Sequence, residues 1–173
     1  MRKRRIRGVY AVTPETPDTD WLAARAEAVL AGGARIVQYR NKNADRQQRR
    51  RQAVRLLELC RAHRALLIVN DDVALARELG ADGVHLGRED QPLRDARAAL
   101  GAERLLGISC YDSLARALEA QELGADYVAF GSFFPSAVKP NAVRARLVLE
   151  VWTVDVVSRE CHCGIERICQ QGA

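Results

Sequence analysis

The sequence predicts an α/β fold built on a parallel β-sheet. Three observations support this prediction. Short apolar runs rich in β-branched residues recur six times, amphipathic segments separate them, and the motif Glu-Leu-Gly-Ala-Asp occurs at 78–82 and again at 122–126. Compact apolar runs are typical of buried parallel strands, which helices connect. Each copy of the motif is expected to end a helix, turn at its glycine and lead into a strand.

The six expected strands are short and have clear ends. Each is bounded by Gly, Asp or Asn, residues that interrupt regular structure. The runs lie at residues 9–12, 36–39, 66–69, 84–86, 105–108 and 127–130.

The intervening segments have helical periodicity, with apolar residues returning every three or four positions. Gly32 and Gly33 are expected to end the first helix, and Asp112 or Ser113 to cap the start of a later one. The apolar positions are Leu22, Ala26, Val29 and Leu30; then Ala53, Leu56, Leu57 and Cys60; and later Leu114, Ala117 and Leu118.

Composition excludes some classes of protein. With 173 residues, 48% hydrophobic and 28% charged, the chain can bury a core, and no apolar run is long enough to span a bilayer. The basic start at 2–7 is not followed by the apolar segment of a signal peptide, so a cytoplasmic location is expected. The net charge is +5. The arginines of 46–55 could form a nucleic-acid face, but a solvated helix face is the favoured interpretation.

Polar side chains follow the expected strands, and the carboxyl ends of parallel strands meet at one face. We therefore expect the following residues to converge there although they are distant in sequence: Arg40, Lys42, Asp71, Asp90, Ser109 and Lys139.

Cations beside two carboxylates suit a polyphosphate and its metal, because Mg²⁺ prefers carboxylate, phosphate and water oxygens. Arginine grips phosphate oxygens bidentately, whereas lysine acts as a point charge. Gln38, Asn70 and Ser109 could orient a polar ring or the diphosphate. No cysteine–histidine or serine–histidine–aspartate set is evident on this face, which argues against a covalent nucleophile.

Each of these residues also has a structural interpretation. Asp71 or Asp72 could cap a helix starting near Val73, and Asp72 is favoured for that role. Asp90 could cap the next helix, before Pro92. Arg40 and Lys42 could be solvated loop charges, and His85 is expected to be a packed strand residue. The functional interpretation is favoured because the residues occur together at five successive strand ends.

Several segments resemble the thiamine-phosphate synthase family, from about residue 8 to about residue 144. They are 10–13 (Tyr-Ala-Val-Thr), 38–42 (Gln-Tyr-Arg-Asn-Lys), 69–72 (Val-Asn-Asp-Asp), 83–90 (Gly-Val-His-Leu-Gly-Arg-Glu-Asp), 107–109 (Gly-Ile-Ser) and 124–128 (Gly-Ala-Asp-Tyr-Val). The resemblance implies a (β/α)8 TIM barrel. It also implies an enzyme that couples 4-amino-2-methyl-5-pyrimidinylmethyl diphosphate to a thiazole phosphate, yielding thiamine phosphate and pyrophosphate.

The resemblance also implies roles for individual residues. Asp71 and Asp90 would bind Mg²⁺, and Arg40, Lys42 and Lys139 would be catalytic by neutralising the leaving pyrophosphate. The pyrimidine diphosphate would be held by Gln38, Tyr39, Arg40, Asn41, Lys42, Asn70, Ser109 and Lys139, and the thiazole phosphate by Ser136, Ala137 and Val138. Small-molecule substrates are the only partners expected, without nucleic acid or membrane, and a homo-oligomer is left open.

The sequence departs from the family after the sixth expected strand. Val138 stands where the family has the second threonine of Thr-x-Thr-Lys, Arg146 stands where a proline is usual, and no Gly-Gly segment follows. A TIM barrel typically takes about 250 residues. We therefore expect a barrel truncated after about six βα units, with a synthase-like domain at 1–147 and an atypical cysteine-containing tail at 148–173.

The tail contains Cys161, Cys163 and Cys169, whose spacing is not a standard zinc pattern. Three alternatives to an active synthase remain: a homologue that binds the pyrimidine diphosphate without turnover, a thiazole tautomerase-like relative, and a basic RNA-binding protein. The intact segments 38–42 and 69–72 favour the synthase.

Overall fold

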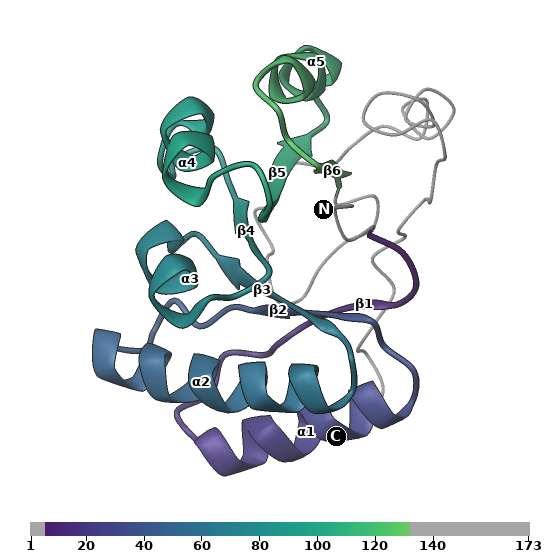
Figure 1. The fold of residues 1–173 in the computed structure, drawn as a ribbon, viewed down its shortest axis with the longest axis vertical. Coiled ribbons are helices and arrows are strands. Elements are labelled where there is room, and N and C mark those ends of the chain that lie inside the picture. The colour runs from purple at the N-terminus through teal and green to yellow at the C-terminus, as the bar shows by residue number, and fades with distance from the viewer. Residues whose placement is uncertain (1–5, 132–173) are drawn as a thin grey trace.

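A computed structural model describes residues 6–131 of the chain. Its six strands form one parallel sheet in which spatial order follows chain order. The strands are β1 (Tyr10–Val12), β2 (Ile36–Tyr39), β3 (Leu66–Asn70), β4 (Gly83–Leu86), β5 (Leu105–Tyr111) and β6 (Tyr127–Phe130). The sheet curves into an arc with the helices on its outer side, which is the arrangement of half a barrel (Figure 1).

The six expected strands are confirmed to within one residue at each end, except β5, which is three residues longer than expected. Ser109 was expected at the end of its strand, but β5 continues through it to Tyr111. The pairing of β5 with β6 shifts register between Ser109 and Tyr111 and still includes Phe130. This irregularity lets the ladder continue, and the strand ends at Tyr111, where φ is +58°.

Five helices connect the strands, and four have a side-chain cap at the start. The helices are α1 (Thr19–Ala31), α2 (Arg46–Ala62), α3 (Val73–Leu79), α4 (Leu93–Leu100) and α5 (Leu114–Glu122). Asp18, Asp45, Asp72 and Ser113 each accept a hydrogen bond from a backbone N–H of the first turn. Such a cap contributes about 1 kcal/mol. The expected cap by Asp72 is confirmed, and the choice between Asp112 and Ser113 is resolved in favour of Ser113.

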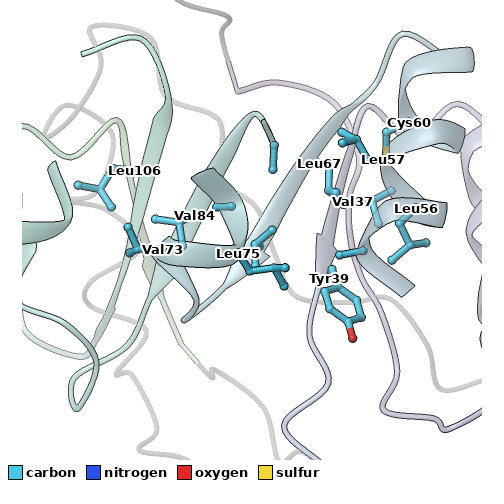
Figure 2. Close-up of a cluster of buried hydrophobic side chains, with 14 of the residues drawn as sticks. Val37, Tyr39, Leu56, Leu57, Cys60, Leu67, Val73, Leu75, Val84 and Leu106 are labelled. Atoms are coloured by element: carbon cyan, nitrogen blue, oxygen red, sulfur yellow. The ribbon is translucent and has the colours of Figure 1, made fainter. Parts of the chain in front are cut away.

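Strand side chains alternate between two apolar layers. Val37, Leu67, Val84 and Leu106 point from four successive strands toward the helices and pack with residues such as Leu56 (Figure 2). A smaller cluster lies on the inner, concave face and consists of Ile36, Leu66, Ile68 and Leu105. Burying one such aliphatic side chain stabilises the fold by about 1.5–3 kcal/mol.

The repeated motif has the same structural role twice. Asp82 accepts a hydrogen bond from the N–H of Leu67 at 2.9 Å, and Asp126 accepts one from Leu106 at 2.8 Å. Each aspartate therefore ties the start of a strand to the preceding strand in the sheet. Arg97 adds to the second copy by donating to the Asp126 carboxylate at 2.6 Å and to the Gly124 carbonyl.

Three of the arginines of α2 pair with acidic groups. Arg50 lies 2.6 Å from Glu78, Arg49 lies 3.7 Å from Asp72, and Arg55 pairs with Glu58 within the helix. This pairing fits a solvated helix face. None of the helices between residues 6 and 131 has the length and apolar character that a membrane crossing requires.

Candidate active site

Three of the expected polar residues lie on the concave face of the sheet. Gln38, Asn70 and Ser109 occupy inward positions of β2, β3 and β5, because they alternate with outward residues of the helix-facing layer. Gln38 is buried, and its side-chain amide donates to the Asn70 carbonyl oxygen at 2.5 Å. These three side chains therefore face the same side of the sheet, although β5 places Ser109 inside the strand rather than at its end.

Charged side chains gather at the carboxyl ends of β2, β3 and β4. The Lys42 ammonium lies 2.9 Å from the Asp71 carboxylate, and Asp71 is close enough to Asp90 to contribute to the raised pKa of that carboxyl. The structure therefore brings together three residues that are separated by up to 48 positions in the chain. A small hollow opens beside them and is lined in part by Lys42, Asn70 and Asp71.

Asp90 is held by the loop that follows β4. Its carboxylate accepts the N–H of Gly87 at 2.5 Å and caps no helix, because Pro92 occupies the N-cap position of α4. Burial first, and then the neighbouring Asp71 carboxyl, raise the pKa of Asp90. The pKa of Lys42 is also raised, chiefly because its hydrogen bond to Asp71 stabilises the charged ammonium. Two carboxyl groups and one ammonium thus share a small volume.

Asp71 adopts a backbone conformation unusual for a residue other than glycine. Its φ is +62°, in the left-handed region, which residues with a Cβ rarely adopt and in which asparagine, aspartate and histidine are enriched. The Asp71 N–H donates to the carbonyl of His85, which fixes this turn against the next strand. A strained residue beside a charged cluster is a frequent feature of functional sites.

Arg40 lies at the same edge and is anchored at both ends. Its guanidinium pairs with Glu15, and its backbone N–H donates to the Thr13 hydroxyl at 2.9 Å. Glu15 is a partner that the sequence did not indicate. The Arg40 head is consequently held beside the loop that follows β1.

Tyr39 and Asn41 point away from this edge, into the layer between the sheet and the helices. Tyr39 is buried, and its hydroxyl donates to the Gln52 side chain at 2.9 Å. Asn41 is also buried and donates to the same oxygen of Gln52 and to the Thr16 carbonyl. The segment 38–42 therefore separates into inward Gln38, the edge cations Arg40 and Lys42, and two residues that anchor the loop.

Three inward residues connect the site but were not among the expected site residues. The Tyr10 and Tyr127 hydroxyls lie 2.8 Å apart, and His85 lies 3.1 Å from Tyr127 and 2.9 Å from Ser109. His85 is packed in its strand, as expected. Its contact with Ser109 is a serine–histidine pair that the sequence did not reveal, because the two residues are 24 positions apart. Tyr10, His85 and Tyr127 each occupy a strand position whose side chain points inward, and this alternation was the signal that could have identified them.

Arg116 is a further residue that sequence reasoning missed. From the first turn of α5, its guanidinium donates to the carbonyls of Ser109 and Gly87, each at 2.9 Å. It therefore ties the end of β5 to the loop that carries Asp90.

The donors present fit a magnesium ion bound together with phosphate. Within residues 6–131 no group of three or more His, Cys, Asp or Glu side chains forms a metal cluster. Asp71 and Asp90 form a pair, and Mg²⁺ commonly takes one or two carboxylates and completes its shell with phosphate and water. The remaining expected residues, Ser136, Ala137, Val138 and Lys139, and the tail cysteines lie outside the described residues.

Comparison with known proteins gives consistent matches. The family model described as thiamine monophosphate synthase matches residues 9–158, beyond the expected boundaries at about 144 and 147. The chain is 60% identical over 146 residues to the thiamine-phosphate synthase of Thioalkalivibrio sulfidiphilus, covering 84% of this chain and 69% of that one. It is 58% identical to the thiamine-phosphate synthase of Thiobacillus denitrificans, covering 82% and 67%.

The solved structures agree with this. The thiamine phosphate pyrophosphorylase of Pyrococcus furiosus matches with a TM-score of 0.72 and 35% identity, over 86% of this chain and 70% of that one. The N-acetylneuraminate lyase of Fusobacterium nucleatum matches with a TM-score of 0.55 over 72% of this chain and 44% of that one. At 16% identity this second likeness concerns the fold alone.

Proposed function

The chain belongs to the thiamine-phosphate synthase family, and we propose that it catalyses the reaction after which the family is named. The pyrimidinylmethyl group of a pyrimidine diphosphate is transferred to the nitrogen of a thiazole phosphate, with release of pyrophosphate. The observation that carries this proposal is the Lys42–Asp71–Asp90 cluster at the carboxyl edge of the sheet. It combines the cation and carboxylates that a metal-bound diphosphate needs.

The carboxylates of Asp71 and Asp90 would hold Mg²⁺. The ion would supply positive charge to the diphosphate oxygens. It would also offset the repulsion from Asp71, which together with burial raises the pKa of Asp90. Both groups are already oriented, Asp71 by its backbone turn and Asp90 by the Gly87 N–H.

Arg40 and Lys42 would neutralise the leaving pyrophosphate. Negative charge grows on the diphosphate as its bond to carbon breaks, and cations held in place stabilise that charge without reorganisation. Glu15 orients the Arg40 guanidinium, while Lys42 is half-exposed and can exchange Asp71 for a phosphate oxygen. We propose Lys139 as a third cation, on the family resemblance of its segment.

The concave face would receive the pyrimidine ring. Gln38, Asn70 and Ser109 supply neutral donors and acceptors there, at positions that the sheet holds rigidly. Tyr39 and Asn41 would contribute by anchoring the loop. Ser136, Ala137 and Val138 would meet the thiazole phosphate, and Val138 removes one hydroxyl from that subsite.

The test is formation of thiamine phosphate by the purified chain with both substrates and Mg²⁺. Activity should disappear with a chelator and fall by at least about 100-fold in Asp71→Asn, since an asparagine keeps the backbone conformation but removes the charge. Glu89→Gln is the matched control, because it removes one negative charge from an exposed side chain next to Asp90.

Each alternative predicts a different outcome. Calorimetric Mg²⁺-dependent binding of the pyrimidine diphosphate without product would identify the homologue that binds without turnover. Rearrangement of the thiazole phosphate without release of pyrophosphate would identify a tautomerase. Full activity of Asp71→Asn would refute the assigned metal ligands.

A further inference from the structure

A single hydrogen-bonded network runs across the concave face and includes one side chain from each described strand. Its order is Asn70 (β3), Gln38 (β2), Tyr10 (β1), Tyr127 (β6), His85 (β4) and Ser109 (β5). Its donor–acceptor distances lie between 2.5 and 3.1 Å. The link between Tyr10 and Tyr127 joins strands that are not neighbours in the sheet. Gln38 and Ser109, on opposite sides of the face, thus belong to one network.

The protons in this network can be counted from the amide end. The Gln38 amide nitrogen donates to Asn70, so its carbonyl oxygen is the acceptor that faces Tyr10. Tyr10 has one hydroxyl proton and donates it to that oxygen at 3.1 Å. The bond between the two tyrosines must then be donated by Tyr127.

The same count sets the tautomer of His85. Because Tyr127 donates its hydroxyl proton to Tyr10, its oxygen can only accept from His85. The 3.1 Å contact between the two therefore requires a proton on the histidine Nδ1. When the imidazole is neutral, Nδ1 carries its one ring proton, so Nε2 is unprotonated and is an acceptor. The Ser109 hydroxyl lies 2.9 Å from Nε2 and donates to it. The Ser109 oxygen can then only accept a further hydrogen bond.

Packing holds the rings of Tyr10, Tyr127 and His85 in this arrangement. A Cβ at position 107 would lie 2.0 Å from the Cζ of Tyr127, so only glycine leaves room for that ring across β5. The ring centroids of Tyr10 and His85 lie 6.0 and 5.6 Å from that of Tyr127. Burial raises the pKa of both tyrosines, which keeps their hydroxyls protonated.

We propose that Tyr10, Tyr127 and His85 are positioning residues that make Ser109 an obligate acceptor toward the bound substrate. The substrate group that such an oxygen selects is an N–H donor, which an aminopyrimidine supplies. This inference rests on the proposed function for its substrate, but the direction of the network can be tested in the free protein.

The direct experiment is NMR of the full chain with ¹⁵N-labelled histidine. The chain has three histidines, so His85→Gln identifies the His85 signals. We expect a protonated Nδ1 and an unprotonated Nε2. In Tyr127→Phe, the His85 Nδ1–H loses the hydroxyl that accepts its hydrogen bond. In Tyr10→Phe, the Tyr127 hydroxyl no longer donates to Tyr10 and is free to donate to Nδ1. Both variants should therefore shift His85 toward the tautomer protonated at Nε2. Tyr111→Phe, a tyrosine outside the network, should leave the signals unchanged.

The kinetic experiment compares the amino substrate with an analogue whose amino group is dimethylated and lacks N–H. The wild type should prefer the amino substrate in kcat/KM. That preference should fall about threefold to tenfold in Tyr127→Phe, the value of one neutral hydrogen bond. A merely structural loss would lower both rates equally.

The outcomes separate this inference from the proposed function. An Nε2–H tautomer in the wild type, or signals that neither variant moves, would overturn the inference even if the enzyme is active. The expected tautomer and shifts in a chain that forms no thiamine phosphate would support the network and refute the proposed activity.

Discussion

Replacement of Asp90 by asparagine should stabilise the metal-free protein while removing its function. The pKa of Asp90 is raised by burial and by Asp71, so the ionised carboxylate is less favourable in the folded chain than in the unfolded one. An asparagine keeps an oxygen that can accept the Gly87 N–H and adds an amide that can donate to Asp71. The substitution therefore removes repulsion without leaving an unpaired group.

The expected gain depends on pH in a defined direction. Because the folded pKa of Asp90 lies above its unfolded value of about 3.9, the native state binds the proton more tightly. The contribution of Asp90 to stability therefore declines as pH rises from about 4 through the folded pKa, and then stays constant. At pH 7 we expect Asp90→Asn to add about 1 kcal/mol, since Lys42 and solvent screen part of the repulsion. This corresponds to about 2–8 °C in Tm.

The assay is thermal and urea unfolding at pH 4 and pH 7, with and without Mg²⁺ and inorganic pyrophosphate. The gain should be present at pH 7 and absent at pH 4, and ligand should raise the Tm of the wild type only. Glu89→Gln should be neutral throughout. A less stable Asp90→Asn at pH 7, or a gain independent of pH, would refute the electrostatic reasoning.

Other consequences can be measured separately. Arg97→Ala should lower the free energy of unfolding by about 2–4 kcal/mol in urea titration, because it leaves the partly buried Asp126 carboxylate without its guanidinium. Gly107→Ala should cost about 1–3 kcal/mol and also reduce turnover in the coupling assay, because the added Cβ displaces the Tyr127 ring. Burial raises the pKa of the Cys110 thiol to about 11, so a thiol reagent at pH 8 should modify Cys110 only at the rate of unfolding. Fast labelling of Cys110 in the native protein would contradict this.

The elements of the fold followed from local signals. The apolar runs at 36–39 and 127–130 are strands with those bounds, and the two Glu-Leu-Gly-Ala-Asp motifs are equivalent turns. The extension of β5 was missed because an interstrand irregularity, rather than the residues of the run, lets pairing continue to Tyr111.

The residue types of the candidate site were predictable from the sequence, but the contacts between individual side chains were not. The edge cations and carboxylates were expected because parallel strands place their carboxyl ends together, and the structure brings Lys42 to Asp71. The outward direction of Tyr39 and Asn41 was not expected, since a contiguous motif does not reveal where its backbone leaves the strand.

The sequence by itself determined the order of the strands, the cap of α3 by Asp72 and the face on which charge collects, because these depend on periodicity and on neighbours in the chain. The tertiary structure alone decided that Tyr10 meets Tyr127, that His85 meets Ser109, and that Arg116 joins two strand ends. Those contacts depend on the curvature of the sheet, which brings inward side chains from all six strands within hydrogen-bond distance across one concave face.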